Sequence, residues 1–175
     1  MNWPNWAGDL PGWITTFAVV VAALQYFNER ERRRAEEQRE AKAQASKLTA
    51  WVAIHFIGDA RQSYGVVISN TSGSTFHDVT VSVLIHGIRA RAITLAILPP
   101  GFYYVRHIGG DEKFEWDFPA PVEGQKGTLR PYMKSDRYQL KQIEFADNLN
   151  QHWVSNSYAV LSIADDRDIR GNGPA

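Results

Sequence analysis

Histidine is the residue type in this sequence best suited to binding metal ions or moving protons near neutral pH. The chain contains five: His55, His77, His86, His107 and His152. No two of them are four positions apart, and none stands beside carboxylates in the spacing of a known metal motif. His77 and Asp78 are adjacent, but neighbours on a strand point to opposite faces. The histidines therefore predict no metal site.

The other residue types that carry out catalysis form no recognisable pattern either. The chain has no cysteine, which excludes disulfides, thiolate metal sites and cysteine nucleophiles. Neither a G-x-S-x-G nucleophile motif nor a phosphate-binding P-loop is present. The carboxylates are scattered, and no pair has the spacing of an acid–base couple. The sequence therefore predicts a non-enzymatic protein without metal or cofactor.

Charged motifs leave two weaker hypotheses. Arg89 and Arg91, in "GIRARAIT", are two positions apart, so on a strand they share one face and form either an anion site or a plain exposed face. The "DDRD" of residues 165–168 is either a weak cation site or part of a solvated tail, and the second interpretation is simpler. Lys and Arg together number 19, as do Asp and Glu, and this balance argues against a nucleic-acid partner.

Among the elements, the most informative is the apolar block "WITTFAVVVAALQYF" at residues 13–27. Its apolar residues lie all round a helix, and aromatic residues bracket it, which is typical of a membrane-spanning helix. The block has 15 residues, or about 22 Å of helix, whereas a span usually takes about 20 residues. The residues expected to contact lipid are Trp13, Ile14, Phe17, Val19, Val20, Val21, Leu24, Tyr26 and Phe27.

Two alternatives to a span remain open. A buried or interfacial helix of a soluble protein has a similar length and composition. A cleaved signal peptide is the weaker alternative, because residues 1–12 contain no lysine or arginine before the apolar run.

The residues after the block predict its orientation. A basic cluster follows at once, and lysine and arginine near a span stay on the cytoplasmic side. We therefore expect residues 1–12 outside and the rest in the cytosol, with the cluster near anionic lipid headgroups. The cluster consists of Arg30, Arg32, Arg33 and Arg34.

Residues 28–48 are rich in Glu, Arg, Ala and Gln and predict a charged helical stalk. Opposite charges four positions apart, as in Glu29–Arg33, support a helix. A coiled-coil seam through Ala41, Ala45 and Leu48 is short and mostly alanine, so a solvated helix is the simpler interpretation.

From residue 49 onward, β-branched and aromatic residues alternate with polar ones between turn signals. The expected strands are 50–57, 64–70, 76–86, 91–98, 102–108, 113–118, 137–145, 152–157 and 158–164. No helical pattern interrupts them, so residues 49–164 predict a mainly β fold, an antiparallel immunoglobulin-like β-sandwich after the membrane helix and stalk. Trp51, Trp116 and Trp153 are the expected large core residues, and residues 165–175 form a flexible tail.

Several motifs resemble a loose group of uncharacterised single-span membrane proteins of actinobacteria and their phages. The similarity covers the apolar block with the Glu/Arg run after it, "TAWV", "VVISNTSGSTFHDVTVSV", "LPPG" and "IEFADNLNQHWVS". The last is similar to a hairpin motif F-x-D-x-x-G-x-x-W-x-R, matched here by Phe145, Asp147 and Trp153. Asn150 replaces the glycine and Ser155 the arginine. The resemblance implies a membrane helix with a cytosolic β-sandwich and no known activity.

These features favour a membrane-anchored, non-enzymatic protein-interaction module whose partners are the lipid bilayer and an unidentified protein. This is an inference from fold class alone. A small-molecule or lipid sensing domain is the first alternative, and a phage or prophage protein that blocks infection at the membrane is the second. A long unpaired strand edge would favour the interaction module, whereas a pocket with converging polar groups would favour the sensor.

The predicted orientation is testable with single cysteines, since the natural chain has none. In intact cells, a membrane-impermeant thiol reagent should label Asn5→Cys and leave Ser72→Cys unlabelled. The reason is that the basic residues after the block are costly to translocate. Labelling at position 72 in unbroken cells would place the β domain on the other side of the membrane.

Overall fold

The computed structural model describes residues 10–58, 60–109 and 115–164. The segments 1–9 and 165–175, including the "DDRD" motif, lie outside the described residues, as do the side chains of Trp13 and Ile14. The chain divides after Lys42 into two compact units, which are considered separately.

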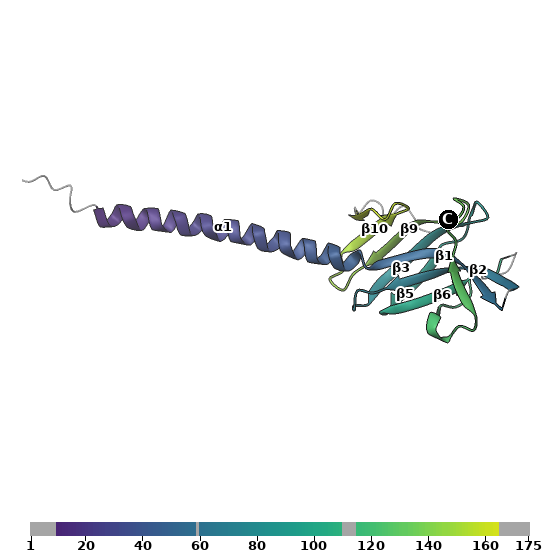
Figure 1. Cartoon of the computed structure of the whole chain (residues 1–175). Coiled ribbons are helices and arrows are strands. Elements are labelled where there is room, and N and C mark those ends of the chain that lie inside the picture. The colour runs from purple at the N-terminus through teal and green to yellow at the C-terminus, as the bar shows by residue number, and fades with distance from the viewer. Residues whose placement is uncertain (1–9, 59, 110–114, 165–175) are drawn as a thin grey trace, which may run out of the picture. The chain divides into compact units, whose positions relative to one another are not determined.

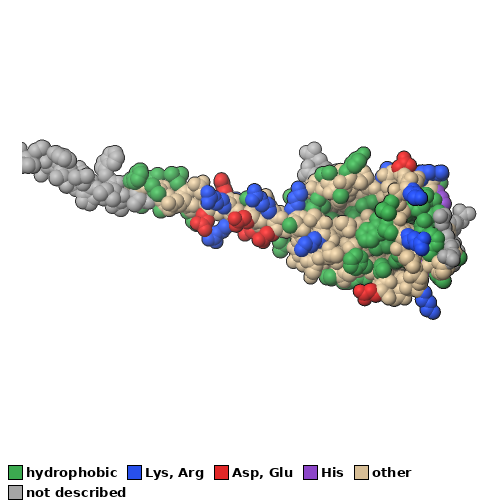
Figure 2. Space-filling view, in the orientation of Figure 1, with side chains coloured by type: hydrophobic (Ala, Val, Ile, Leu, Met, Phe, Trp, Pro, Cys, Tyr) green, Lys and Arg blue, Asp and Glu red, His purple; other side chains and the backbone are tan. Residues whose placement is uncertain are grey.

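The first unit is helical. Helix α1 runs from Leu10 to Ala45 without interruption, through both the apolar block and the charged stretch (Figure 1). In the described part of the block the large apolar side chains are exposed, and charged side chains follow them along the helix (Figure 2). Within the described residues no helix is long and apolar enough to cross a membrane. The exposed apolar residues are Phe17, Val19, Val20, Leu24, Tyr26 and Phe27; Val21 is half-buried.

The basic cluster lies on the same helix. Arg30, Arg32, Arg33 and Arg34 are all exposed. The expected Glu29–Arg33 ion pair is confirmed, at 2.8 Å between Arg33 Nη2 and Glu29 Oε1. The hydrogen bond from Arg33 lowers the pKa of Glu29. Both side chains are largely in water, so this pair adds little to helix stability.

The second unit is mainly β, with two antiparallel sheets consistent with a β-sandwich. In the first sheet the order is β7 (Ala120–Pro121), β6 (Gly101–Arg106), β2 (Ala60–Asn70), β1 (Leu48–Ile57) and β8 (Thr128–Pro131). In the second it is β11 (Leu161–Ile163), β10 (His152–Asn156), β9 (Gln139–Ala146), β3 (Phe76–Ile85) and β4 (Ile88–Arg89), with β5 (Ile93–Leu98) also paired to β3. A short 3₁₀ helix, η2 (Val122–Gly124), follows β7.

The alternation in the sequence sets the core. On β3, Val79, Val81, Val83 and Ile85 are buried, as the pattern predicts. At the start of β3, Phe76 packs edge-on against Phe145 of β9, with ring centroids 4.8 Å apart. From β1 and β2 the buried residues include Val52, Ile54, Val66 and Ile68.

The three tryptophans expected in the core differ in how deeply they are buried. Trp153 is 3% exposed, which confirms it as a core residue. Trp51 is half-buried, because it lies on the face of β1 opposite Val52 and packs with Ala53 in a small separate cluster. Trp116 is also half-buried and lies outside any regular strand. The expectation that all three belong to the core is therefore confirmed for Trp153, holds in part for Trp51, which packs against a core cluster from a half-buried position, and is wrong for Trp116.

Asn70 connects the two sheets at the end of β2. Its side chain is buried, and Nδ2 donates to the carbonyl oxygens of Ser74 (2.8 Å) and Leu98 (3.0 Å). Oδ1 accepts from the backbone N–H of Ser72 at 3.1 Å. Because Leu98 ends β5 in the other sheet, this one amide fixes the end of β5 against β2.

The β9–β10 hairpin lies at the expected position. Asp147 is buried; its Oδ1 accepts from the backbone N–H groups of Leu149 and Gln151, each at 2.9 Å. Its Oδ2 accepts from Trp153 Nε1 at 2.9 Å. Asn150 has a φ of 60°, in the left-handed region that asparagine tolerates in place of glycine. The spacing of these residues is thus explained by one carboxylate that organises the turn.

The expected strand at 113–118 is not found in its described part. Residues 115–118 form only an isolated bridge, between Trp116 and His107, and Phe118 is 88% exposed. Phe114 lies outside the described residues. Conversely, the sequence pattern does not predict the short strands β7 and β8, because two to four residues carry too little pattern to identify a strand.

Asp147→Ala should lower the free energy of unfolding by about 3 kcal/mol, because it leaves a buried indole N–H and two turn N–H groups without their acceptor. Chemical denaturation of the full chain in mild detergent measures this. Asp136→Ala, at an exposed aspartate, is the control and should change stability by less than about 0.5 kcal/mol. Equal effects of the two substitutions would contradict the role given to Asp147.

Candidate functional site

Strand β5 forms an edge of its sheet. Among the described residues its only strand partner is β3, in a register that pairs Val79 with Leu95 and Thr80 with Thr94. Its sequence, "ITLAIL", contains no charge and no proline. The other outer strands are shorter: β7 has two residues, β11 three and β8 four, and β7 and β8 each end in proline. A long, uncharged edge is a template for pairing with another strand.

A groove with a volume of about 730 Å³ runs beside this edge. Ile93, Thr94 and Leu95 of β5 line one side, and the segment 115–119 lines the other. Clefts that bind ligands usually measure about 300–1,000 Å³, so the groove is large enough to hold one. The groove therefore has one wall formed by strand β5 and another formed by the segment 115–119, which is called the loop wall below.

The loop wall is tied to the start of β5 by side-chain hydrogen bonds. Glu115 Oε2 accepts from the backbone N–H of Arg91 at 2.9 Å, and Trp116 Nε1 donates to the Arg91 carbonyl at 2.6 Å. Glu115 Oε1 also lies 3.2 Å from His107 Nε2 at the end of β6. These contacts satisfy both backbone groups of Arg91 and attach the segment 115–119 to the residues just before β5.

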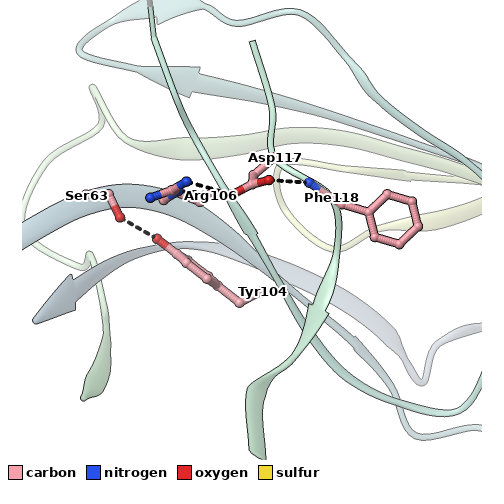
Figure 3. A network of polar contacts seen from close by, with 5 residues as sticks. All are labelled: Ser63, Tyr104, Arg106, Asp117 and Phe118. Atoms are coloured by element: carbon pink, nitrogen blue, oxygen red, sulfur yellow. Dashed lines mark hydrogen bonds and ion pairs between the residues drawn. The ribbon is translucent and has the colours of Figure 1, made fainter. Parts of the chain in front are cut away.

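A second set of contacts holds the far part of the loop wall (Figure 3). Asp117 Oδ2 accepts from Arg106 Nη2 at 2.8 Å, and Asp117 Oδ1 accepts from the backbone N–H of Phe118 at 2.9 Å. The Phe118 ring points away from this network, which explains its 88% exposure. A large apolar ring held by its backbone yet open to solvent is suited to contact a ligand.

A separate contact next to this network involves Tyr104 of β6. Its hydroxyl lies 3.1 Å from Ser63 Oγ, and its ring lies directly over Gly65, where a Cβ would collide with it. Burial raises the pKa of Tyr104. Gly65 thus allows the close packing that supports β6, the strand that carries Arg106.

The charged side chains that line the groove differ in whether they have bonding partners. The carboxylates of Glu115 and Asp117 accept the hydrogen bonds described above. The Arg91 guanidinium is exposed and makes no ion pair with any described residue. Arg89 is exposed as well but does not line the groove. Of the arginine pair read as an anion site or an exposed face, the structure therefore brings only Arg91 to this site.

The histidines do not converge. His55 is buried with Nε2 2.6 Å from the Lys126 carbonyl, His86 contacts Tyr138, and His107 contacts Glu115. Across the described ranges, no cluster of three or more His, Asp or Glu side chains is arranged to hold a metal ion.

A cluster of tyrosines is a second candidate for a functional site. Tyr138 stacks on Tyr64, with ring centroids 4.8 Å apart, and lies 4.2 Å from the Tyr132 ring. Its hydroxyl is 2.7 Å from His86 Nδ1, and loss of solvation raises the pKa of Tyr138 to about 12. Because these rings pack on one another, the cluster joins the β3–β4 turn to the segment before β9 and is best explained as structural.

A second cavity of about 300 Å³ lies between β1 and strands β9 to β11. Leu140, Ile143 and Leu161 line it together with serines, and no charged side chain does. Its volume is at the lower end of the size range of ligand sites.

The groove residues were not identified as a site from the sequence. The sequence pattern predicts Thr94 and Leu95 only as part of a strand, and Trp116 as a core residue. The available signal was the uncharged run "ITLAIL", six residues without a gatekeeping charge, followed by "PPG". That Phe118 lies opposite this run could not be read from local pattern.

In a comparison with known proteins, no family model, curated protein or solved structure matches the chain. The resemblance to actinobacterial and phage membrane proteins therefore stays a prediction.

The two tryptophans should differ in their contribution to stability. Trp153→Ala should lower the free energy of unfolding by about 3–5 kcal/mol, as expected for a buried large aromatic. Trp116→Ala, at a half-buried groove residue, should cost about 1–2 kcal/mol. Denaturant titration of both variants measures the difference, and an equal loss would place Trp116 in the core.

Proposed function

We propose that this chain is a membrane-anchored, non-enzymatic protein-interaction module that binds an extended segment of a partner protein along strand β5. The observation that carries the proposal is the six-residue edge of β5, uncharged and free of proline, which opens onto the groove. A partner strand added there gains main-chain hydrogen bonds, while its side chains enter the space beside β5. The two antiparallel sheets and the size of the domain support an immunoglobulin-like classification as part of this proposal.

The proposed anchor is the apolar block at the beginning of α1. Phe17 is 71% exposed, Val19 63% and Tyr26 64%, so this helix leaves large apolar side chains in contact with solvent. Each Å² of apolar surface removed from water contributes about 25 cal/mol, which favours burial of the block in a bilayer. The basic cluster that follows supports a cytosolic β domain close to lipid headgroups.

The sensing alternative has one observation in its favour, the 300 Å³ cavity between the sheets. Its lining suits a small apolar molecule. A phage or prophage protein that blocks infection is one biological setting in which a membrane-held binding module would act, and it requires the same groove.

Binding to the groove is testable with a labelled eight-residue peptide of alternating valine and threonine, titrated against the full chain in mild detergent. Fluorescence anisotropy should show saturable binding, and Phe118→Ala should weaken it about tenfold by removing an exposed aromatic contact. Met133→Ala is the matched control, because Met133 is 85% exposed and does not line the groove.

Thr94→Pro provides a second variant, because proline on a strand edge removes a backbone donor and disfavours strand addition. It should also weaken binding. If the peptide does not bind, or if Phe118→Ala binds it as well as Met133→Ala does, the groove is not the binding site.

A further inference from the structure

The polar groups around the groove are not equally available to a ligand. Glu115 bridges His107 and the Arg91 backbone, and Asp117 holds Arg106 and the Phe118 backbone. A ligand cation would have to compete with these bonds for either carboxylate. The Arg91 guanidinium has no such engagement within the described part of the chain. Arg91 is the one basic side chain among the described residues that line the groove, and its guanidinium is the charged group there without an ion-pair or hydrogen-bond partner among them.

Arg91 lies next to the open edge of strand β5. Arg91 lies two residues before β5, and Thr94 and Leu95 line the same groove. Its backbone groups are already bonded to Glu115 and Trp116, so the free edge begins after it. A strand paired along β5 would thus run past Arg91 at one end, where only the guanidinium is left to interact.

We infer that the groove selects an extended peptide with a carboxylate side chain opposite Arg91 and apolar side chains against Leu95, Trp116 and Phe118. This inference rests on the proposed function and specifies the chemistry of its partner. Guanidinium and carboxylate form two parallel charge-assisted hydrogen bonds, which are stronger and more directional than neutral ones. Arg89, exposed two positions earlier, extends the positive charge along the approach.

The geometry favours a single strand over a second copy of this chain. Pairing of β5 with β5 of another copy would bring that copy's loop wall, residues 115–119, towards the same space. A groove bounded by β5 on one side and the segment 115–119 on the other accommodates one extended peptide instead.

Three labelled peptides test the inference. All have valine at alternate positions; the positions between are glutamate, threonine or lysine. Anisotropy titrations with the full chain in mild detergent should give the glutamate peptide at least tenfold tighter binding than the threonine peptide, and the lysine peptide the weakest. The preference should decrease as salt is raised, because exposed charges are screened.

The key variant is Arg91→Gln, which removes the charge and leaves the backbone contacts of residue 91 in place. It should reduce the preference for glutamate over threonine to less than about twofold. Lys134→Gln is the matched control, because Lys134 is exposed and does not line the groove. It should leave the preference unchanged.

The outcomes separate this inference from the proposed function. Equal binding of all three peptides, sensitive to Phe118→Ala, would overturn the acidic preference and retain the interaction module. Binding of none would overturn both. Concentration-dependent dimers in analytical ultracentrifugation that Thr94→Pro abolishes would assign the edge to a second copy. Displacement of the glutamate peptide by inorganic phosphate at equal concentration would reduce the site to a simple anion site.

Discussion

In a structure of two open sheets, the outermost strands have a strand partner on one side only. The rest of this molecule depends on how those exposed strand edges are protected. Each outer strand presents backbone N–H and C=O groups without a strand partner. Three of the four edges are shortened to two, three or four residues, and two of these end in proline. Strand β5 is the exception, with six uncharged residues beside a groove. In the proposed function, the unprotected edge is the one that receives the partner.

The shape of that edge depends on buried polar side chains at the turns. Asn70 fixes the end of β5 through the Leu98 carbonyl, and Glu115 and Trp116 fix the residue before it. Asp147 plays a similar part in the β9–β10 hairpin. No buried side-chain nitrogen or oxygen lacks a hydrogen-bond partner within the described residues. Such fully satisfied polar groups hold a groove in one geometry, because an alternative arrangement would leave them unpaired.

In the proposed function, the helix and the β domain have separate tasks. The apolar side chains of α1 would hold the chain at a bilayer, while the β5 groove would recognise an extended acidic segment. Anchoring of this kind raises the effective concentration of a binding module towards any partner in the same membrane, so a groove of modest affinity is sufficient. The charged part of α1, with its exposed Glu29–Arg33 pair, would connect the proposed anchor to the β domain.

The sequence by itself determined the features that follow from local pattern. Alternation on residues 79–85 predicted which side of β3 is buried, and two strand patterns, at 137–145 and 152–157, separated by turn-forming residues predicted the hairpin. Period and turn chemistry act over a few residues, so they can be read directly. Tertiary structure decided the rest. Trp51 is large and apolar, as core residues usually are, but it lies on the face of β1 opposite Val52. Only long-range pairing makes β5 an edge, and only the folded chain brings Phe118 and Arg91 to one groove, because contacts between distant segments depend on the packing of the whole domain.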